Sequence, residues 1–374
     1  MEFIVSSNEL LGHLSLIKGV INSKNTLPIL DNFLFNLENN VLKITASDLE
    51  STLNTQLSLD NATGDGVIAI EAKRLFDMLK EFSDQPLTFK IDMDTYRVDI
   101  FSGNGKFSIV GQNGKEFPKL PELNASSAAS FRIDSTVFLK GINSTIFATA
   151  DDELRPVMNG IYIELTADYF RMVATDSHKL VRFTRHDIAP GTDASFILPK
   201  KSATILKNIL AKDGNDIKIE FDEKNAFFSL TDFKLTCRLI EGKYPAYGSV
   251  IPINNPNKLT IDRHEFYNSM KRVSLFANQA SNLSKLTMKG TQLTISAQDI
   301  DFSISAYENL NCLYDGDPMD IGFKSGFLLE ILSNIHSVDV NLEMSDPSRA
   351  GILTPVDKDA EGEDVLMLIM PMMV

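Results

Sequence analysis

The sequence predicts an α+β protein with three repeated domains, each having two helices packed on antiparallel sheets. Three observations predict it: helix-start segments recur at a fixed interval, alternating apolar stretches lie between them, and short polar linkers separate the repeats. The helix-start segments begin at Val5, Ile133 and Ile261, so both steps are 128 residues, and such recurrence indicates repeated structural units. The predicted domains are residues 1–124, 129–253 and 258–374.

Each predicted helix begins after a strand. In the first of these segments a polar residue can cap the helix, and Leu10, Leu14 and Ile17 follow at helical spacing. A second set of strand-to-helix segments starts at Ile68, Phe196 and Ile321, in steps of 128 and 125 residues. The predicted helices are residues 8–18, 71–82, 136–147, 199–212, 264–276 and 324–335.

Alternating apolar and polar residues predict strands between the helices. Examples are residues 40–46, 168–174 and 291–297, each of which has the period of a half-buried strand. Every domain is therefore predicted to run β-α-β-β-β and then β-α-β-β-β, with its helices on one face of the sheets. Three unrelated α+β domains are the alternative, but these sets of segments would then have to recur in one order by chance.

Composition limits the class of protein. The 374 residues are 43% hydrophobic and include 24 Phe, enough for sizeable cores. The sequence has no run of eighteen apolar residues, and its first residues lack the basic start of a signal peptide. Cys237 and Cys312 are far apart in sequence, which favours reduced thiols and a cytoplasmic location.

The charge is unevenly distributed along the chain. A net charge of −14 alone argues against binding to nucleic acid. The six predicted helices, however, contain 12 basic and 6 acidic residues, so the remainder carries −20. Basic helices on an acidic body predict one positive face, which would contact DNA through phosphates without reading sequence. Ordinary solvated lysines on amphipathic helices remain the alternative.

The stretch VATDSHKL places Asp176, Ser177 and His178 side by side, which suggests a hydrolase triad. The repeat argues against it, because only the Asp recurs, as Asp48 and Asp299, in the equivalent segments. Adjacent residues also rarely converge as a triad must. We therefore predict a turn-capping Asp and a surface His, with Ser177-based hydrolysis as the alternative.

Other chemical motifs are missing from the sequence. It contains neither a phosphate-binding Gly-x-x-x-x-Gly-Lys-Ser/Thr loop nor a Gly-x-Ser-x-Gly elbow. The five histidines have no metal-ligand spacing with one another or with the cysteines. We expect no catalytic site, no cofactor and no metal.

Five segments in the same order resemble one family over the whole chain. The chain is similar to the bacterial DNA polymerase III beta subunit, the replicative sliding clamp. The segments that carry the resemblance are NTLPILDNFLF (25–35), LRPVMNGIYIE (154–164), VATDSHKL (173–180), EGKYPAYGSVIP (241–252) and MPMMV (370–374).

The resemblance implies a non-enzymatic processivity factor. Two subunits with three DNA-clamp domains each would join head to tail as a homodimer and close a ring around double-stranded DNA. Short linear motifs of the DNA polymerase III catalytic subunit, the clamp loader, other polymerases and repair proteins would dock in a hydrophobic pocket. No membrane is involved. A protein-only scaffold of three repeats is the remaining alternative.

The resemblance also assigns roles to individual positions. The pocket would be formed by Met158, Thr175, Ser177, His178, Lys179, Leu180, Pro245, Val250, Ser348, Leu368, Met370, Pro371 and Met372. DNA would be contacted by Lys24, Lys73, Arg155, Lys200 and Lys201. The dimer interface would include Phe107 and Ile109 of one subunit and Leu275 and Phe276 of the other. The sequence departs from the family pattern at Ser177, Lys179, Ser249 and the Met373-Val374 ending, which bears on the motif that the pocket prefers.

Overall fold

The chain was analysed as a computed structural model. It describes residues 1–22, 25–124, 126, 128–212, 215–357 and 360–374. These residues form two compact units. Unit 1 comprises Met1–Leu139 and Thr204–Leu239, and unit 2 comprises Lys140–Ala203 and Ile240–Val374. The second predicted domain contributes to both units.

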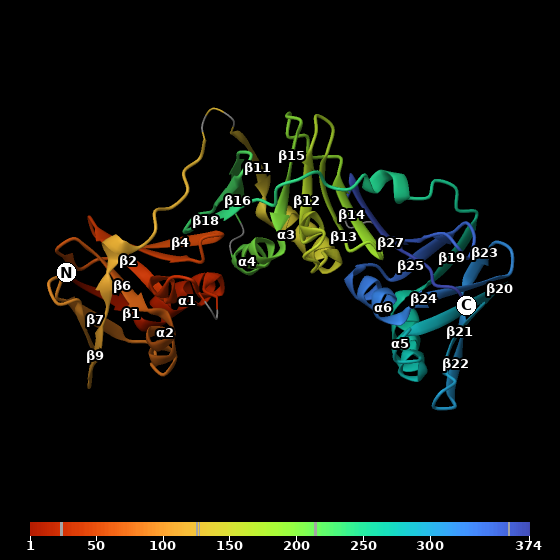
Figure 1. The fold of residues 1–374 in the computed structure, drawn as a ribbon, viewed down its shortest axis with the longest axis horizontal. Coiled ribbons are helices and arrows are strands. Elements are labelled where there is room, and N and C mark those ends of the chain that lie inside the picture. Colours follow the sequence, from red (N-terminus) through yellow and green to blue (C-terminus); the bar gives the residue numbers. More distant parts are fainter. Residues whose placement is uncertain (23–24, 125, 127, 213–214, 358–359) are drawn as a thin grey trace. The chain divides into compact units, whose positions relative to one another are not determined.

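Each repeat was predicted to contain two consecutive β-α-β-β-β units, and this order is confirmed in all three repeats (Figure 1). The first repeat contains β1 (Glu2–Ser6), α1 (Ser7–Ile17), β2 (Asn32–Glu38), β3 (Val41–Ser47), β4 (Ser51–Ser58), β6 (Gly66–Glu71), α2 (Ala72–Lys80), β7 (Pro86–Ile91), β8 (Arg97–Phe101) and β9 (Lys106–Val110). The second contains β11 (Ala129–Asp134), α3 (Ser135–Thr145), β12 (Gly160–Leu165), β13 (Phe170–Thr175), β14 (Lys179–Arg185), β15 (Ala194–Pro199), α4 (Lys200–Leu210), β16 (Asp216–Phe221), β17 (Asn225–Ser229) and β18 (Phe233–Arg238). The third contains β19 (Asn257–Asp262), α5 (Arg263–Val273), β20 (Leu283–Lys289), β21 (Gln292–Asp299), β22 (Ile304–Asn311), β24 (Met319–Lys324), α6 (Ser325–Asn334), β25 (Asp339–Met344), β26 (Gly351–Pro355) and β27 (Glu363–Ile369).

Unit 1 has two antiparallel sheets. A five-stranded sheet has the order β5-β1-β7-β8-β9, where β5 is the short strand Ala62–Thr63. A nine-stranded sheet has the order β10-β6-β2-β3-β4-β18-β17-β16-β11, where β10 is Gln112–Asn113. Strand β4 of the first repeat pairs with β18 of the second, with Leu53 opposite Leu235. The sheet therefore continues across two repeats.

Unit 2 repeats this construction. Its nine-stranded sheet has the order β15-β12-β13-β14-β27-β26-β25-β19-β23, where β23 is Leu313–Asp315. Strand β14 of the second repeat pairs with β27 of the third over seven positions, from Lys179 opposite Ile369 to Arg185 opposite Glu363. A four-stranded sheet, β22-β21-β20-β24, completes the unit.

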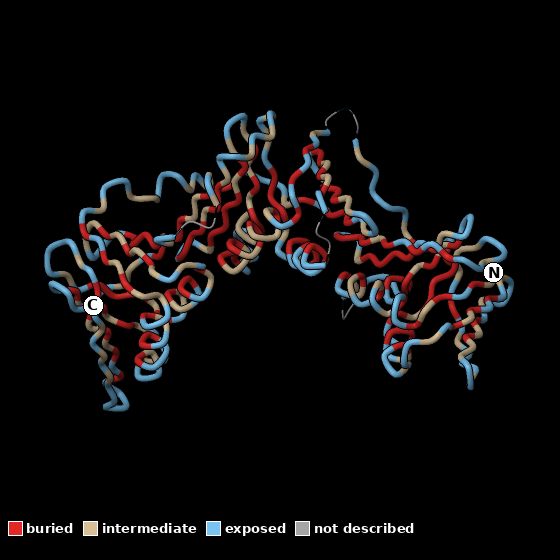
Figure 2. The backbone as a smooth tube through the Cα atoms, turned by 180° about the vertical axis from the view of Figure 1, so that it is seen from behind, coloured by how far each residue is buried: buried red, intermediate tan, exposed pale blue. Residues whose placement is uncertain are grey.

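The helices are short and amphipathic. In α1, Ser6 caps the first turn by accepting the Glu9 N–H at 3.3 Å, and Leu10 and Leu14 are fully buried. Helix α1 packs on α2, and α5 packs on α6; buried residues alternate with exposed ones along each of these helices (Figure 2). In the part of the chain that the structure describes, no helix is both long and apolar enough to cross a membrane.

A partly buried ion pair links α3 to β27 within unit 2. The Lys140 Nζ donates to both carboxylate oxygens of Glu363, at 2.7 and 2.8 Å, and the Glu363 side chain is only 6% exposed. Removing one partner of such a pair leaves a buried charge uncompensated. The pair therefore constrains how α3 sits on the strand that leads to the C-terminus.

We predict that Lys140→Met lowers the stability of unit 2 by about 3 kcal/mol, because Glu363 loses its partner. Urea denaturation followed by circular dichroism measures the effect. The matched control is Lys258→Met, which breaks the exposed 3.6 Å pair with Glu343 and should cost less than about 1 kcal/mol. Equal losses in the two variants would contradict the role given to the buried pair.

Candidate functional site

An aspartate closes the same turn in all three repeats. The Asp176 Oδ1 accepts the N–H groups of His178 and Lys179, both at 2.9 Å. Asp48 accepts two N–H groups in the same way in the first repeat, and Asp299 does so in the third. The prediction of a turn-capping Asp is confirmed.

Ser177 and His178 have separate partners. Ser177 lies in the left-handed region, at φ 76°; its Oγ accepts from Arg155 at 2.6 Å and donates to the Met158 sulfur at 3.4 Å. The exposed His178 ring instead stacks on Phe327 of α6, with ring centroids 5.6 Å apart. The two side chains do not form the nucleophile-base pair that hydrolysis requires, so the triad hypothesis is wrong.

Lys179 fixes this turn against α6. Its side chain is only 5% exposed, and the Nζ contacts Asp176 at 2.8 Å and Glu330 at 2.9 Å. It also lies 4.5 Å from the centre of the Phe327 ring. Burial opposes the charge of Lys179, but the hydrogen bonds to the two carboxylates outweigh it and raise the pKa of this ammonium. The turn is therefore held charged and rigid.

The C-terminal residues lie beside the same turn. Leu180 of β14 is opposite Leu368 of β27, and both are buried. One residue past β27, the Met370 N–H donates to the His178 carbonyl at 2.9 Å. The Met370 side chain is 42% exposed. The backbone of an exposed methionine is thus joined to the turn that carries His178, and methionine is a residue suited to adaptable apolar recognition.

An apolar cluster lies directly behind the turn. Leu180 and Leu368 pack in it with Tyr244 and with partly buried Tyr247. The Tyr244 ring also stacks on Tyr162, with centroids 4.8 Å apart. The complete set of buried members is Val173, Leu180, Ile197, Tyr244, Ala350, Ile352, Leu366 and Leu368. These side chains form a buried apolar layer next to the turn.

A polar network supports the outer tyrosine. The Tyr247 hydroxyl donates to Glu164 at 2.8 Å and accepts from Arg171 at 3.0 Å. Burial raises the pKa of Tyr247 to about 12, so the phenol stays neutral and keeps donating. Arg171 and Glu164 also contact each other at 3.2 Å. The network holds the Tyr247 ring against the cluster.

The structure brings most of the predicted pocket residues together within unit 2. Met158, Thr175, Ser177, His178, Lys179, Leu180, Leu368 and Met370 are linked by the contacts above and by the Thr175 hydroxyl, which donates to the Lys179 carbonyl. Pro245, Val250 and Ser348 flank cluster members in sequence. Val250 is 54% exposed, and Ser348 is engaged with Asp346 in its own turn. Pro371 is half-buried, and Met372 pairs with Gly322 on β24.

Sequence reasoning missed Phe327 and Lys324 of the α6 segment. The Phe327 ring contacts three side chains. It stacks on the His178 ring, and the ammonium groups of Lys179 and Lys324 lie over it, that of Lys324 at 4.7 Å from the ring centre. The sequence signal was weak, because an aromatic residue next to buried Leu328 fits the apolar face of any amphipathic helix. Its contacts with His178 and Lys179 become visible only in the structure, where α6 lies beside the turn that leads into β14.

The predicted DNA-contacting residues occupy helix starts and loops. Lys73 is exposed on α2, and Lys200 and Lys201 begin α4. Arg155 is tied to Asp152 at 2.9 Å and to Ser177, which places it at the edge of the pocket turn. Lys24 lies outside the described residues.

The predicted dimer residues lie at exposed sheet ends. Phe107 and Ile109 belong to β9, the last strand of its sheet, and Phe107 is 38% exposed. Leu275 and Phe276 follow α5 in a single turn of 3-10 helix that packs beside β22, the end strand of the four-stranded sheet. Sequence reasoning missed the exposed apolar residues of β22 itself, such as Tyr307.

Comparison with known proteins gives the family. Sequence models of the DNA polymerase III beta subunit match three consecutive parts of the chain: the N-terminal domain at residues 1–121, the central domain at 132–246 and the C-terminal domain at 248–373. The chain belongs to this family. The beta sliding clamp of Pseudomonas aeruginosa is 26% identical over 373 residues, covering all of both chains.

Solved structures of this beta-subunit family have the same fold. The Pseudomonas aeruginosa sliding clamp, determined bound to griselimycin, matches with a TM-score of 0.94 at 26% identity over all of both chains. The Bartonella birtlesii sliding clamp, also bound to griselimycin, matches with a TM-score of 0.92 at 29% identity, again over all of both chains. The predicted fold class, three repeated clamp domains, is confirmed.

Proposed function

We propose that this beta subunit is a ring-shaped DNA sliding clamp. Two copies close around duplex DNA without sequence specificity and tether the replicative polymerase for processive synthesis. The observation that carries the proposal is the match of all three family domains, in order, along nearly the whole chain. The protein acts as a processivity factor rather than as a catalyst, and it works in the cytoplasm without a cofactor. Its clamp domains comprise residues 1–124, 129–253 and 258–374.

The proposed DNA contacts are weak and independent of sequence. Exposed helix cations such as Lys73 supply phosphate contacts, while the net charge of −14 disfavours tight adhesion elsewhere. A ring that encircles DNA stays on it without strong binding. Weak contacts therefore allow the ring to slide along the duplex. The residues assigned to DNA are Lys24, Lys73, Arg155, Lys200 and Lys201.

Retention on circular DNA tests this function. Protein loaded on nicked circular DNA by a clamp loader should co-elute with the DNA in gel filtration at 0.3 M NaCl. Cutting the circle once should release it, because the ring then slides off the ends. Retention that persists after linearisation, or that is lost in salt before cutting, would contradict encirclement.

Two sheet ends supply the proposed dimer contact. Strand β9 presents Phe107 and Val110, and β22 presents Ile304 and Tyr307; all four side chains are exposed in the single chain. An exposed, apolar end strand is a template for pairing with another chain. We place β9 of one copy beside β22 and the Leu275–Phe276 turn of the other, so that two such contacts close the ring.

We predict that Phe107→Asp converts the dimer into a 41.6 kDa monomer, because a buried, unpaired carboxylate in the interface costs several kcal/mol. Light scattering coupled to gel filtration measures the mass. Val338→Asp, at a position that is 65% exposed and lies away from both end strands in sequence, is the control and should leave twice that mass. A Phe107→Asp dimer of normal affinity would refute the interface.

The cluster and its rim form the proposed peptide pocket. It receives short linear motifs of the DNA polymerase III catalytic subunit, the clamp loader, other polymerases and repair proteins. Both relatives bound to griselimycin share this fold, and exposed Met370 and His178 over a buried apolar floor give this chain an adaptable surface. Phe327 joins the residues already assigned to the pocket.

We predict that His178→Ala weakens griselimycin binding roughly tenfold, since it removes the ring stacked on Phe327 and one wall of the pocket. Isothermal titration calorimetry measures the affinity. His336→Ala, another exposed histidine, is the matched control and should bind as the unmodified chain does. Unchanged affinity in His178→Ala, with the dimer intact, would show that the ligand binds elsewhere.

A further inference from the structure

The last residues of the chain are attached to an end strand. Strand β24 is the end of the four-stranded sheet. Its Gly322 forms an antiparallel bridge with Met372, and the Met372 N–H donates to the Gly322 carbonyl at 2.8 Å. Two residues earlier, the Met370 N–H donates to His178. The C-terminal tail, residues 370–374, therefore has one backbone anchor in the pocket and another on β24.

Gly322 leaves the space in which the tail lies. A Cβ atom at this position would come within 2.9 Å of the Met372 carbonyl oxygen and within 2.9 Å of a Val374 methyl group. It would also lie 2.7 Å from the end of the Leu283 side chain. Leu283 can rotate away, but the Met372 carbonyl is backbone and moves only if the tail moves. A side chain at residue 322 thus competes directly with the tail.

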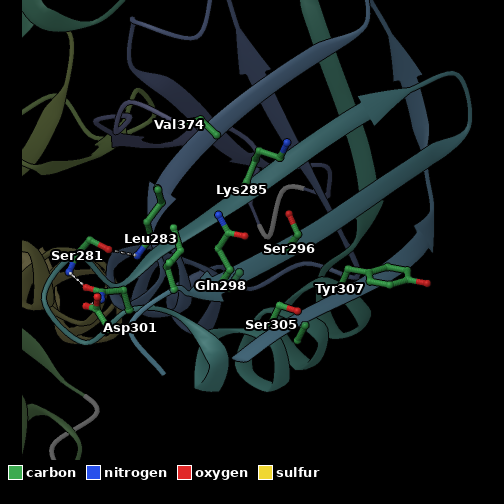
Figure 3. Close-up of a pocket in the computed structure, with 13 residues that line it drawn as sticks. Ser281, Leu283, Lys285, Ser296, Gln298, Asp301, Ser305, Tyr307 and Val374 are labelled. Atoms are coloured by element: carbon green, nitrogen blue, oxygen red, sulfur yellow. Dashed lines mark hydrogen bonds between the residues drawn. The ribbon is translucent and has the colours of Figure 1, made fainter. Parts of the chain in front are cut away.

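The sheet face next to Gly322 is open to solvent. Gly322, Lys285, Ser296 and Tyr307 are opposite one another on successive strands, so that they share one face. Lys285, Ser296 and Tyr307 border, together with Val374, a shallow groove of about 590 Å³, which also includes Leu283 and Gln298 (Figure 3).

We propose that Gly322 is a positioning residue for the peptide pocket, because it seats the C-terminal tail and thereby holds Met370 beside His178. This inference rests on the proposed pocket. A β-bridge at Met372 restricts the two residues before it, and only Pro371 separates the bridge from Met370. The fixed φ of Pro371 passes that restraint to Met370. Without the bridge, Met370 keeps a single hydrogen bond and becomes mobile.

The strand itself tolerates a side chain at residue 322. Gly322 does not have a positive φ, and it lies within a regular antiparallel ladder, opposite Lys285. Alanine or valine can adopt this backbone, and valine favours strands. Substitution therefore displaces the tail without breaking β24.

The test compares Gly322→Ala and Gly322→Val with Gly12→Ala, a glycine whose added Cβ meets nothing within 4 Å. Each variant is made in the full chain and in a chain that ends at Met370. Carboxypeptidase digestion followed by mass spectrometry measures how fast the tail is trimmed beyond Met372. Griselimycin affinity is measured by calorimetry, and thermal unfolding and dimer mass are recorded as controls for folding.

We expect faster trimming in both Gly322 variants and a roughly tenfold weaker affinity for Gly322→Val, the equivalent of losing one partly buried methionine contact. In the chain that ends at Met370, Gly322→Val should cause no further loss, since the anchor is already gone. Gly12→Ala should match the unmodified chain in tail trimming and in griselimycin affinity.

Three results would overturn the inference. Unchanged trimming would show that Gly322 does not seat the tail. Faster trimming with unchanged affinity would show that the anchor does not position the pocket. An equal loss of affinity in full-length and shortened chains would indicate general damage instead. If the unmodified chain fails to bind griselimycin, the proposed pocket fails, and trimming alone decides whether Gly322 anchors the tail.

Discussion

Pairing between end strands of neighbouring repeats is the constraint on which the rest of the structure depends. Each repeat alone would expose unpaired backbone groups at its sheet ends. The β4–β18 and β14–β27 ladders satisfy those groups and convert separate repeats into continuous nine-stranded sheets. Strands β9 and β22 remain as ends that carry exposed apolar residues. In the proposed ring, a second copy would pair with these end strands in the same way.

The site of the proposed peptide pocket depends on one of these ladders. Pairing of β14 with β27 brings the turn at Asp176 next to the residues that follow Ile369. The turn itself belongs to every repeat, because Asp48 and Asp299 accept the same backbone N–H groups. Only in the second repeat does it carry a lysine that is buried between two carboxylates and stacked on an aromatic ring. The same structural turn therefore has different side-chain contacts in the second repeat, where we place the pocket.

The sequence predicted the parts of the fold that depend on local pattern. Six helices and their order emerged from periodicity and from the 128-residue step, because caps and apolar spacing are encoded within a few neighbouring residues. Pairing between repeats was not predictable in this way, since it depends on which strand ends meet. The turn role of Asp176 was predicted from the repeat, but Phe327 was not, because its partners are some 150 residues away in sequence.

The glycine at position 322 shows how a fold can be constrained by a missing side chain. The strand backbone would accept alanine or valine there, so neither helix nor strand propensity explains the glycine. Its reason lies fifty residues further on, where the Met372 carbonyl and the Val374 methyl group occupy the space that a Cβ would take. The pocket therefore depends on β24 as well as on β14 and β27. The bridge to β24 fixes the end of the chain on the four-stranded sheet. This attachment limits the positions that Met370 can take in the pocket.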